Sequence, residues 1–323
     1  MIDVSVVIPT YNYARHLPKA IESVLSQEGV NLELIIVDDG STDDTMELLA
    51  SYGDQILSFR QKNQGAQVAR NLGLQKAKGG FICFLDSDDY FLPNSVRLRQ
   101  QFLLRHPECD WVYSNWLISD LDGEVAGKGA DLFNHGDLRW EGEIFSTLLK
   151  SRGGINLVGP MFRREQIVSI GGFDVSLKAC QDYDLLLKAS RGKNVAFLDI
   201  PLGVQRFHKS HISSRPELRY LAELSILKKY RSDQFAWQYL KDIYSPRVSN
   251  IYNYLVIIYM RKGERWAALK ASVSSMLAKP VQGAAYRFLF YVLQGRRGPL
   301  ERAMKNRVID LIDRAQNKDD LRS

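Results

Sequence analysis

The chain of 323 residues is 45% hydrophobic and 25% charged, as is ordinary for a soluble globular protein, and it can hold one large domain with an appendage or two modest domains. Its three scattered cysteines argue against a disulfide-stapled secreted protein and against a zinc cluster, and no apolar stretch approaches the roughly 20 residues of a membrane-spanning helix. The net charge of +6 is uneven, because residues 1–214 carry −5 and residues 215–323 carry +11, which indicates an anionic surface as a partner.

Three apolar runs, each ending abruptly in polar or acidic residues, mark the first part of the chain: VSVVIPTYN at 4–12, IIVDDGSTDDT at 35–45 and FICFLDSDD at 81–89. Runs of this length between turn residues are typical of strands buried on both faces of a parallel sheet. Ligands of an open α/β sheet bind outside the carboxyl ends of its strands. We therefore expect the polar residues that follow these runs to converge on one edge of a sheet.

Helical patterns alternate with these strands. The predicted helices are 17–25, a helix capped by Thr42 that ends before Gly53, 64–78, and one that runs from Pro93 to near Arg105. The resulting β-α-β-α order predicts a mainly parallel, doubly wound sheet, and therefore an α/β fold.

The rest of the chain is less regular and then changes character. Residues 110–119 and 195–205 are predicted strands, and helices are predicted at 141–150, 164–170 and 182–190. From Pro216 onward helical segments dominate, with a helical hairpin expected at 250–277. We therefore predict a sheet-containing domain at residues 1–214 and a basic α-helical region at residues 215–323.

Asp86-Ser87-Asp88, followed by Asp89, places several carboxylates at one strand end. Such crowding is unfavourable unless a cation or hydrogen-bond donors compensate the charge. Oxygen ligands suit hard ions such as Mg²⁺ or Mn²⁺, which bridge protein carboxylates and substrate phosphates. An isolated Asp-x-Asp is more often a solvated acidic turn, but the apolar strand before it and the two companion runs favour metal-linked binding of a diphosphate.

Asp39 and Tyr11 are the candidates for contact with a nucleotide base or ribose. A carboxylate at position 39 can accept the imide N–H of uracil or a ribose hydroxyl, and the ring of Tyr11 can stack on a base. The alternatives are helix capping by the acidic segment and ordinary packing of a strand-end tyrosine. The order of PTYN and DDGS favours base binding.

Four segments, VVIPTYN, VDDGSTDDT, QGAQVARN at 64–71 and FLDSDD, resemble the N-terminal half of the family 2 inverting glycosyltransferases with the GT-A fold. The resemblance continues through GGFD at 171–174 and QDYDLLLKASR at 181–191, so it covers roughly residues 1–212. Each motif is weak alone, but their order and spacing together are a strong signal. The resemblance implies a GT-A type nucleotide-binding sheet flanked by helices, with a C-terminal α-helical extension.

The first two motifs hold the nucleotide in that family, which implies this role for Pro9, Thr10, Tyr11 and Asp39. Arg70 matches an arginine that contacts the nucleotide side in relatives.

The Asp-x-Asp motif implies ribose and metal contacts for Asp86 and Asp88, with Asp88 as a ligand of a Mg²⁺ or Mn²⁺ cofactor. A histidine near position 208 resembles one that reaches the metal or the diphosphate in some relatives, and a neutral imidazole is an acceptable ligand. His208 is therefore the second predicted metal ligand, ahead of His211. The neighbouring Arg206 and Lys209 could equally neutralise phosphate, and a polar surface loop is the plain alternative.

The catalytic base of the family lies in a Glu-Asp pair at the start of a helix. This chain reads Gln181-Asp182, so the first acidic position is lost and the resemblance makes Asp182 the base. Inversion needs a base on the face opposite the departing diphosphate, placed to take the proton of the acceptor hydroxyl. The absent neighbouring charge predicts a weaker base than in relatives. The alternative is that Asp182 and Asp184 only stabilise a helix start.

Aromatic and basic residues raise two further questions. Trp111, Trp116 and Trp140 are candidates to flank a sugar acceptor, although core packing is the commoner fate of tryptophan. In the C-terminal region, Lys and Arg alternate with aromatic and leucine clusters, which suits a helix lying on an anionic membrane and equally the solvated face of a helical cap. Nucleic-acid binding is not expected, because no recognised motif accompanies the charge.

The sequence therefore predicts a cytosolic enzyme that moves a sugar from a nucleotide-diphosphate donor, expected to be UDP-linked, to a hydroxyl of a polysaccharide or lipid-linked glycan. The basic C-terminal region is expected either to make peripheral contact with the inner face of the membrane or to pack on the catalytic domain. Two alternatives remain: a nucleotidyltransferase, which lacks its glycine- and arginine-rich loop here, and a non-catalytic subunit that binds a nucleotide sugar.

Overall fold

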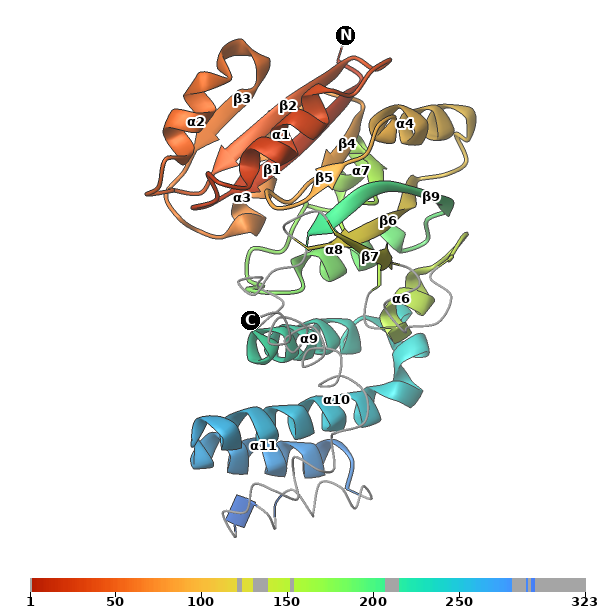
Figure 1. Cartoon of the computed structure of the whole chain (residues 1–323). Coiled ribbons are helices and arrows are strands. Elements are labelled where there is room, and N and C mark those ends of the chain that lie inside the picture. The colour runs from red at the N-terminus through yellow and green to blue at the C-terminus, as the bar shows by residue number, and fades with distance from the viewer. Residues whose placement is uncertain are drawn as a thin grey trace. The chain divides into compact units, whose positions relative to one another are not determined.

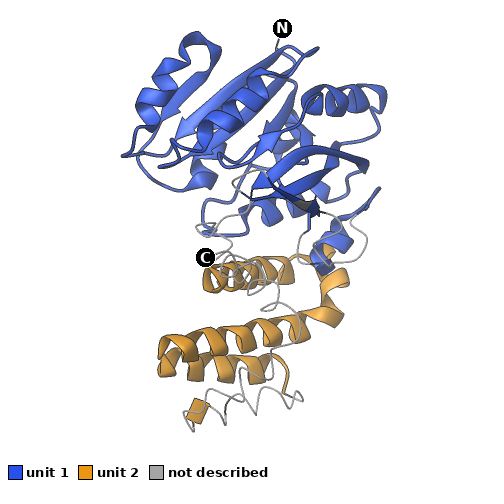
Figure 2. Cartoon of the chain, in the orientation of Figure 1, with its two compact units in different colours: residues 1–214 blue, residues 215–323 orange. Residues whose placement is uncertain are grey.

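The computed structural model describes residues 2–120, 124–129, 139–151, 154–206, 215–280, 289 and 292–293 (Figure 1). The chain divides into two compact units, residues 1–214 and residues 215–323 (Figure 2). The first unit is built on one mixed sheet with flanking helices, and the described part of the second unit is helical. The expected α/β fold with a C-terminal helical extension is confirmed.

Four parallel strands in the order β3-β2-β1-β4 form the first half of the sheet. They are β1 (Val4–Thr10), β2 (Leu32–Asp38), β3 (Leu57–Arg60) and β4 (Phe81–Phe84). Every residue of β1 is buried, because helices cover both faces, and this explains its nearly continuous apolar sequence. β3 has no apolar run from which it could be predicted, because it is a short and largely exposed edge strand.

The helices α1 (Leu17–Leu25) and α3 (Ala66–Lys76) pack on opposite faces of these strands. The apolar residues of α1 join Val6 and Ile8 in one core cluster, and Figure 1 shows α1 crossing that face. Val7 points to the other face, where a Cβ on Gly73 of α3 would lie 2.3 Å from its Cγ1 atom. A glycine at position 73 therefore lets α3 approach β1 closely, and the first turn of α3 lies near the strand ends.

The helices α1 and α2 (Thr45–Ser51) show how well helix starts were predicted. The predicted α1 is confirmed at both ends. Helix α2 begins two residues later than expected, with Asp44 and not Thr42 as its N-cap, because Thr42 donates from its backbone N–H to the Asn12 side chain at 2.7 Å and is held outside the helix. The backbone N–H of Thr45 instead donates to Asp43 at 3.2 Å. A 3-10 turn, Gly53–Gln55, follows α2.

The second half of the sheet is mixed, so the expectation of a mainly parallel sheet is wrong there. β8 (Met161–Arg163) runs antiparallel to both β4 and β6 (Trp111–Ser119) and joins the two halves. β6 is parallel to β9 (Val195–Arg206), and β9 is antiparallel to β5 (Tyr90–Phe91). A three-residue strand such as β8 has no periodicity from which a sequence pattern could predict it.

The first unit also contains one further strand and four further helices within the residues that the structure describes. They are β7 (Val125–Lys128), α4 (Ser95–Arg105), α6 (Phe145–Ser151), α7 (Arg164–Ser169) and α8 (Gln181–Ser190). Helix α6 begins four residues later than predicted, because Gly142 pairs with Val195 of β9 in an isolated antiparallel bridge.

The tryptophans of β6 belong to the core. Trp111 is fully buried and donates from Nε1 to the carbonyl of Ala189 at 3.2 Å, and Trp116 is 1% exposed and donates to Gln205 at 3.3 Å. The proposed contact of these two rings with a sugar acceptor is therefore wrong. Trp140 is partly buried and packs against the same core.

Arg99 of α4 is fully buried, and no carboxylate within the described residues pairs with it. Its guanidinium donates to the carbonyls of Val158, Gly159 and Pro160 at 2.8 to 3.2 Å and stacks on the ring of Phe91, 4.6 Å from the centroid. Burial lowers the pKa of Arg99. This side chain therefore holds the segment that enters β8.

Arg99→Met is expected to lower the free energy of unfolding by about 2–4 kcal/mol, because the three carbonyls lose their donor in a buried place. Urea unfolding followed by circular dichroism measures this change. Arg97→Met on the same helix, where the arginine bonds to Asn94 at the surface, serves as control and should stay within about 0.5 kcal/mol. Equal effects of the two substitutions would contradict the assigned role of Arg99.

The second unit contains α9 (Pro216–Arg231), α10 (Gln234–Lys262) and α11 (Arg265–Ala278). Helix α10 begins sixteen residues before the predicted start at residue 250, because Asp233 caps it by accepting from the Ala236 N–H. The helix continues through Pro246, a residue type that usually breaks a helical pattern in a sequence. A buried ion pair between Arg247 and Glu223, at 2.7 Å, joins α10 to α9. Among the described residues, none of the helices is both long and apolar enough to cross a membrane.

Candidate active site

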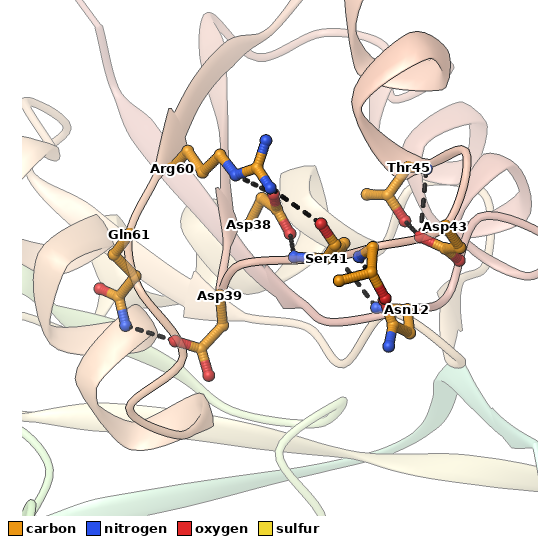
Figure 3. Close-up of polar contacts among 9 residues, drawn as sticks. Asn12, Asp38, Asp39, Ser41, Asp43, Thr45, Arg60 and Gln61 are labelled. Carbon is orange, nitrogen blue, oxygen red and sulfur yellow. Dashed lines mark hydrogen bonds and ion pairs between the residues drawn. The ribbon is translucent and has the colours of Figure 1, made fainter.

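Asp38 and Asp39 at the end of β2 point to different partners (Figure 3). Asp38 is fully buried, accepts from the Ser41 N–H at 2.9 Å and lies 3.3 Å from the Nε atom of Arg60. It stabilises the turn after the strand.

Asp39 accepts three hydrogen bonds, from the Gln61 side chain at 2.7 Å and from the backbone N–H groups of Gln64 and Gly65 at 2.9 and 2.7 Å. Its carboxylate therefore holds the turn that leads into α3. About four acceptor positions exist on a carboxylate, so capacity for one ligand donor remains.

The end of β1 lies beside this turn. Pro9 and Thr10 are buried, and the hydroxyl of Thr10 has no hydrogen-bond partner within the described residues. Tyr11, the next residue, is 43% exposed. Asn12 has a positive φ of 54° and accepts from the Thr42 N–H, which ties the two strand ends together. An exposed ring and an unused hydroxyl at adjacent positions suit contact with a ligand.

Asp86, Asp88 and Asp89 each offer a carboxylate oxygen within 4.8 Å of the others. Burial raises the pKa of Asp89 well above its usual range, and the negative charges of Asp88 and Asp86 raise it further. Three carboxylates at this spacing, one of them fully desolvated, match the oxygen donors that a hard divalent cation prefers. The residues present therefore fit such an ion, and Asp89 joins the two residues expected from the Asp-x-Asp motif.

Arg206 at the end of β9 fixes the position of this acidic turn. Its backbone N–H donates to the Asp89 carboxylate at 2.9 Å, and its guanidinium donates to the carbonyls of Asp88 and His16. This guanidinium was a candidate for neutralising a phosphate, but in the structure it donates to two backbone carbonyls. His208, the predicted second metal ligand, lies outside the described residues, as do Lys209 and His211.

Arg70 connects the acidic turn to the predicted base. It is 7% exposed and its Nη2 atom donates to the Asp86 carboxylate. Burial raises the pKa of Asp182, the positive charge of Arg70 lowers it, and the negative charge of Asp86 raises it. Arg70 therefore contacts Asp86, and both lie within electrostatic reach of Asp182, although 96 positions of sequence separate the two aspartates.

Asp182 lies in the first turn of α8, after Cys180 in the left-handed region at φ 56°. One of its oxygens accepts from the Tyr183 N–H at 2.8 Å. Gln181, which stands where the family has a glutamate, donates to the Gln67 side chain at 3.4 Å and to the Leu177 carbonyl at 3.3 Å. A neutral amide at position 181 therefore links α8 to α3 without adding a charge beside Asp182.

Comparison with known proteins gives the family. The profile of Glycosyl transferase family 2 matches residues 5–135. An uncharacterized glycosyltransferase of Rickettsia typhi is 33% identical over 219 residues, which are 65% of this chain and 66% of that protein. The chain belongs to glycosyltransferase family 2. The matched region covers between 21% and 66% of the length of this and three other rickettsial relatives.

Solved structures show the fold of this family 2 member. S. aureus TarS 1-349 in complex with UDP-GlcNAc has a TM-score of 0.65 at 18% identity, covering 95% of this chain and 93% of that one. The mannosyltransferase PcManGT from Pyrobaculum calidifontis, in complex with GDP-Man and Mn²⁺, has a TM-score of 0.56 at 18% identity, covering 93% and 82%. Both likenesses support the GT-A architecture of the sheet.

Proposed function

We propose that this family 2 member is an inverting glycosyltransferase that uses a nucleotide-diphosphate sugar and in which Asp182 is the catalytic base. The observation that carries the proposal is that Asp182 lies within electrostatic reach of Arg70 and of Asp86, which follows the end of the parallel strand β4. Ligands of α/β sheets bind at such strand ends. Residues 1–214 would then be the catalytic domain.

In the proposed reaction the oxygen of an acceptor hydroxyl forms a bond to the anomeric carbon of the sugar. The bond from that carbon to the diphosphate oxygen breaks, and its electron pair leaves with the nucleoside diphosphate. Asp182 takes the hydroxyl proton. The raised pKa of Asp182 makes it a stronger base than an ordinary carboxylate, which suits this proton transfer.

A divalent cation, Mg²⁺ or Mn²⁺, would be held by Asp88 with Asp86 and Asp89, and His208 remains a further proposed ligand. Such an ion stabilises the negative charge of the departing diphosphate. The ring of Tyr11 would stack on the base, and Asp39 and Thr10 would accept or donate hydrogen bonds to the nucleoside. We propose UDP as the nucleotide, which is also the one in the TarS complex.

The proposal is tested by a screen of UDP- and GDP-sugars for Mn²⁺-dependent binding and for slow hydrolysis by the purified protein. One UDP-sugar is expected to bind more tightly than the others and to release UDP in a metal-dependent way. Absence of binding for every nucleotide sugar, with the protein folded, would overturn the proposal. A preference for a GDP-sugar would overturn only the choice of nucleotide.

The pH dependence of transfer follows from the raised pKa of Asp182. A base acts only when deprotonated, so the rate should fall as the pH drops through the pKa of Asp182, above the ordinary aspartate value of about 3.9. Gln181→Glu adds a like charge beside Asp182, and the acid limb of the kcat/KM profile should move to higher pH. Gln55→Glu, which adds the same charge at an exposed position, should leave the limb in place. A limb that moves equally in both variants would contradict the assignment.

We also propose a glycan or lipid-linked acceptor, reached through peripheral contact of the basic second unit with an anionic membrane. Support comes from α11, where Trp266, Val273 and Leu277 are 84%, 42% and 77% exposed on one helical face, together with Lys270. Exposed apolar side chains beside cations suit the interface of an anionic bilayer, where each basic residue adds about 1 kcal/mol.

Vesicle binding tests this contact. The protein is expected to sediment with vesicles of phosphatidylglycerol and not with pure phosphatidylcholine, and Trp266→Ser with Leu277→Ser should weaken the binding by about tenfold or more. Leu104→Ser removes another exposed leucine, 61% exposed in α4 of the acidic unit, and should have no effect. Equal binding to both kinds of vesicle, or equal loss in both variants, would contradict the proposed membrane contact.

A further inference from the structure

One face of helix α3 contacts the chain segment that precedes and begins α8. Gln67, Arg70, Asn71 and Leu74 follow the i, i+3, i+4, i+7 spacing of a single helical face. Gln67 accepts from Gln181 of α8, and the other three lie against the GGFD segment at 171–174. The sequence motifs QGAQVARN and GGFD, far apart in the chain, are therefore the two sides of one contact.

The Asn71 side chain binds both backbone groups of Phe173. Its Nδ2 atom donates to the Phe173 carbonyl at 2.9 Å, and its Oδ1 atom accepts from the Phe173 N–H at 2.8 Å. One amide thus takes the place of a neighbouring strand and fixes both the position and the direction of the backbone. Gly172 permits this approach, because its φ is +63° and a Cβ there would lie 2.5 Å from Asn71 Oδ1.

The ring of Phe173 is 2% exposed and is held between β4 and Arg70. It meets the ring of Phe84 edge to face, with centroids 4.8 Å apart and planes at 88°, and the Arg70 guanidinium carbon lies 5.2 Å from its centroid. The Nε atom of Arg70 is buried without a hydrogen-bond partner in the part of the chain that the structure describes. The guanidinium is therefore positioned by the ring on one side and by its bond to Asp86 on the other.

We propose that Asn71 and Phe173 are positioning residues that hold the Arg70 guanidinium next to the carboxylates of Asp86 and Asp182. Neither residue touches the reacting atoms in this arrangement, and both act through Arg70. The inference rests on the proposed function for its catalytic consequence and goes beyond it by assigning a role to GGFD and to Asn71. Without the ring, the guanidinium keeps its charge but loses a desolvated cation–π contact, so it is no longer held where that charge best offsets the repulsion between the two carboxylates.

The test compares two phenylalanines whose rings each lie beneath a cationic side chain of helix α3. Phe173→Leu removes the ring under Arg70, and Phe59→Leu removes the ring under Lys76, whose Nζ atom is also 5.2 Å from the ring centroid. We expect Phe173→Leu to lower kcat/KM for the nucleotide sugar by about tenfold and Phe59→Leu to leave it unchanged. In an Arg70→Ala background, Phe173→Leu should cause no further loss, because residues that act through one group are non-additive.

A second readout does not depend on turnover. The Arg70 guanidinium lies over the Phe173 ring, so in the nuclear magnetic resonance spectrum its Nε–H proton should resonate upfield of arginines that have no ring beside them. Phe173→Leu should return it to the ordinary arginine range, Asn71→Ala should move it in the same direction, and Phe59→Leu should leave it in place. Asn71→Ala also serves if Phe173→Leu does not fold.

An Arg70 signal that stays in place in the folded variants would overturn the inference, as would equal losses of kcat/KM with and without Arg70. A wild-type protein that transfers no sugar would instead contradict the proposed function. The Arg70 signal would still decide whether Asn71 and Phe173 position the guanidinium.

Discussion

Asp182→Asn is expected to lower the rate of sugar transfer by about a thousandfold while leaving the affinity for UDP within about threefold. Asparagine has nearly the same shape, can still accept from the Tyr183 N–H through its side-chain oxygen, and cannot take a proton from an acceptor hydroxyl. The loss should therefore appear in kcat. Steady-state kinetics with the donor found in the screen, together with calorimetric titration of UDP, measures both quantities.

The matched control is Glu165→Gln, which neutralises an exposed carboxylate in the first turn of the neighbouring helix α7. Its rate should equal that of the wild type, because a helix-start carboxylate away from the site contributes only a few tenths of a kcal/mol. Unchanged turnover in Asp182→Asn would remove the base from the mechanism. Nucleotide binding without turnover in the wild type, with every acceptor tried, would favour the non-catalytic alternative.

Asp88→Asn is expected to weaken Mn²⁺ binding by roughly a hundredfold and to abolish the increase of UDP affinity that Mn²⁺ produces in the wild type. Asp88 is 7% exposed and shares the acidic turn with Asp86 and Asp89, so the amide removes one negative charge from the proposed cation site. The charge on the diphosphate would then lack its counter-ion. Titration of Mn²⁺ followed by electron paramagnetic resonance, with and without UDP, measures the change.

Asp110→Asn provides the comparison for this variant. Asp110 precedes β6 and pairs with Lys193 at 3.0 Å, so its loss should change stability and leave Mn²⁺ binding as it is. A wild type whose UDP affinity is the same with Mn²⁺ and with a chelator would contradict the metal proposal. That result would not affect the proposal that Asp182 is the catalytic base.

Local sequence patterns predicted the strands and helices in which burial follows a regular pattern along the chain. The apolar runs of β1, β2 and β4 were recognisable because both faces of each strand are buried, and α1 was recognisable because one stripe of it faces the core. Helix starts were less well predicted. Contacts from elsewhere in the chain, such as the bond from Thr42 to Asn12, decide where the first helical residue lies.

The same limit applies to the site. The order of the motifs placed Asp86, Asp88 and Asp182 in one hypothesis. In the fold, Arg70 contacts Asp86 and its charge lowers the pKa of Asp182. No pattern could show that Asp39 binds the turn before α3, or that the guanidinium of Arg206 is held by backbone carbonyls. Those contacts join residues far apart in the chain, and their partners become neighbours only after folding.

The amino-acid sequence by itself determined the family, the parallel first half of the sheet and the acidic residues that can carry the chemistry. The tertiary structure alone decided that β8 runs antiparallel between the two halves, that the Arg206 N–H binds Asp89 in the acidic turn, and that Asn71 binds Phe173 across 102 residues. The physical reason is the range of the interactions. Apolar periodicity and strand-end polarity are local properties of a chain, whereas a hydrogen bond or a cation–π contact between distant segments exists only when the whole sheet has assembled.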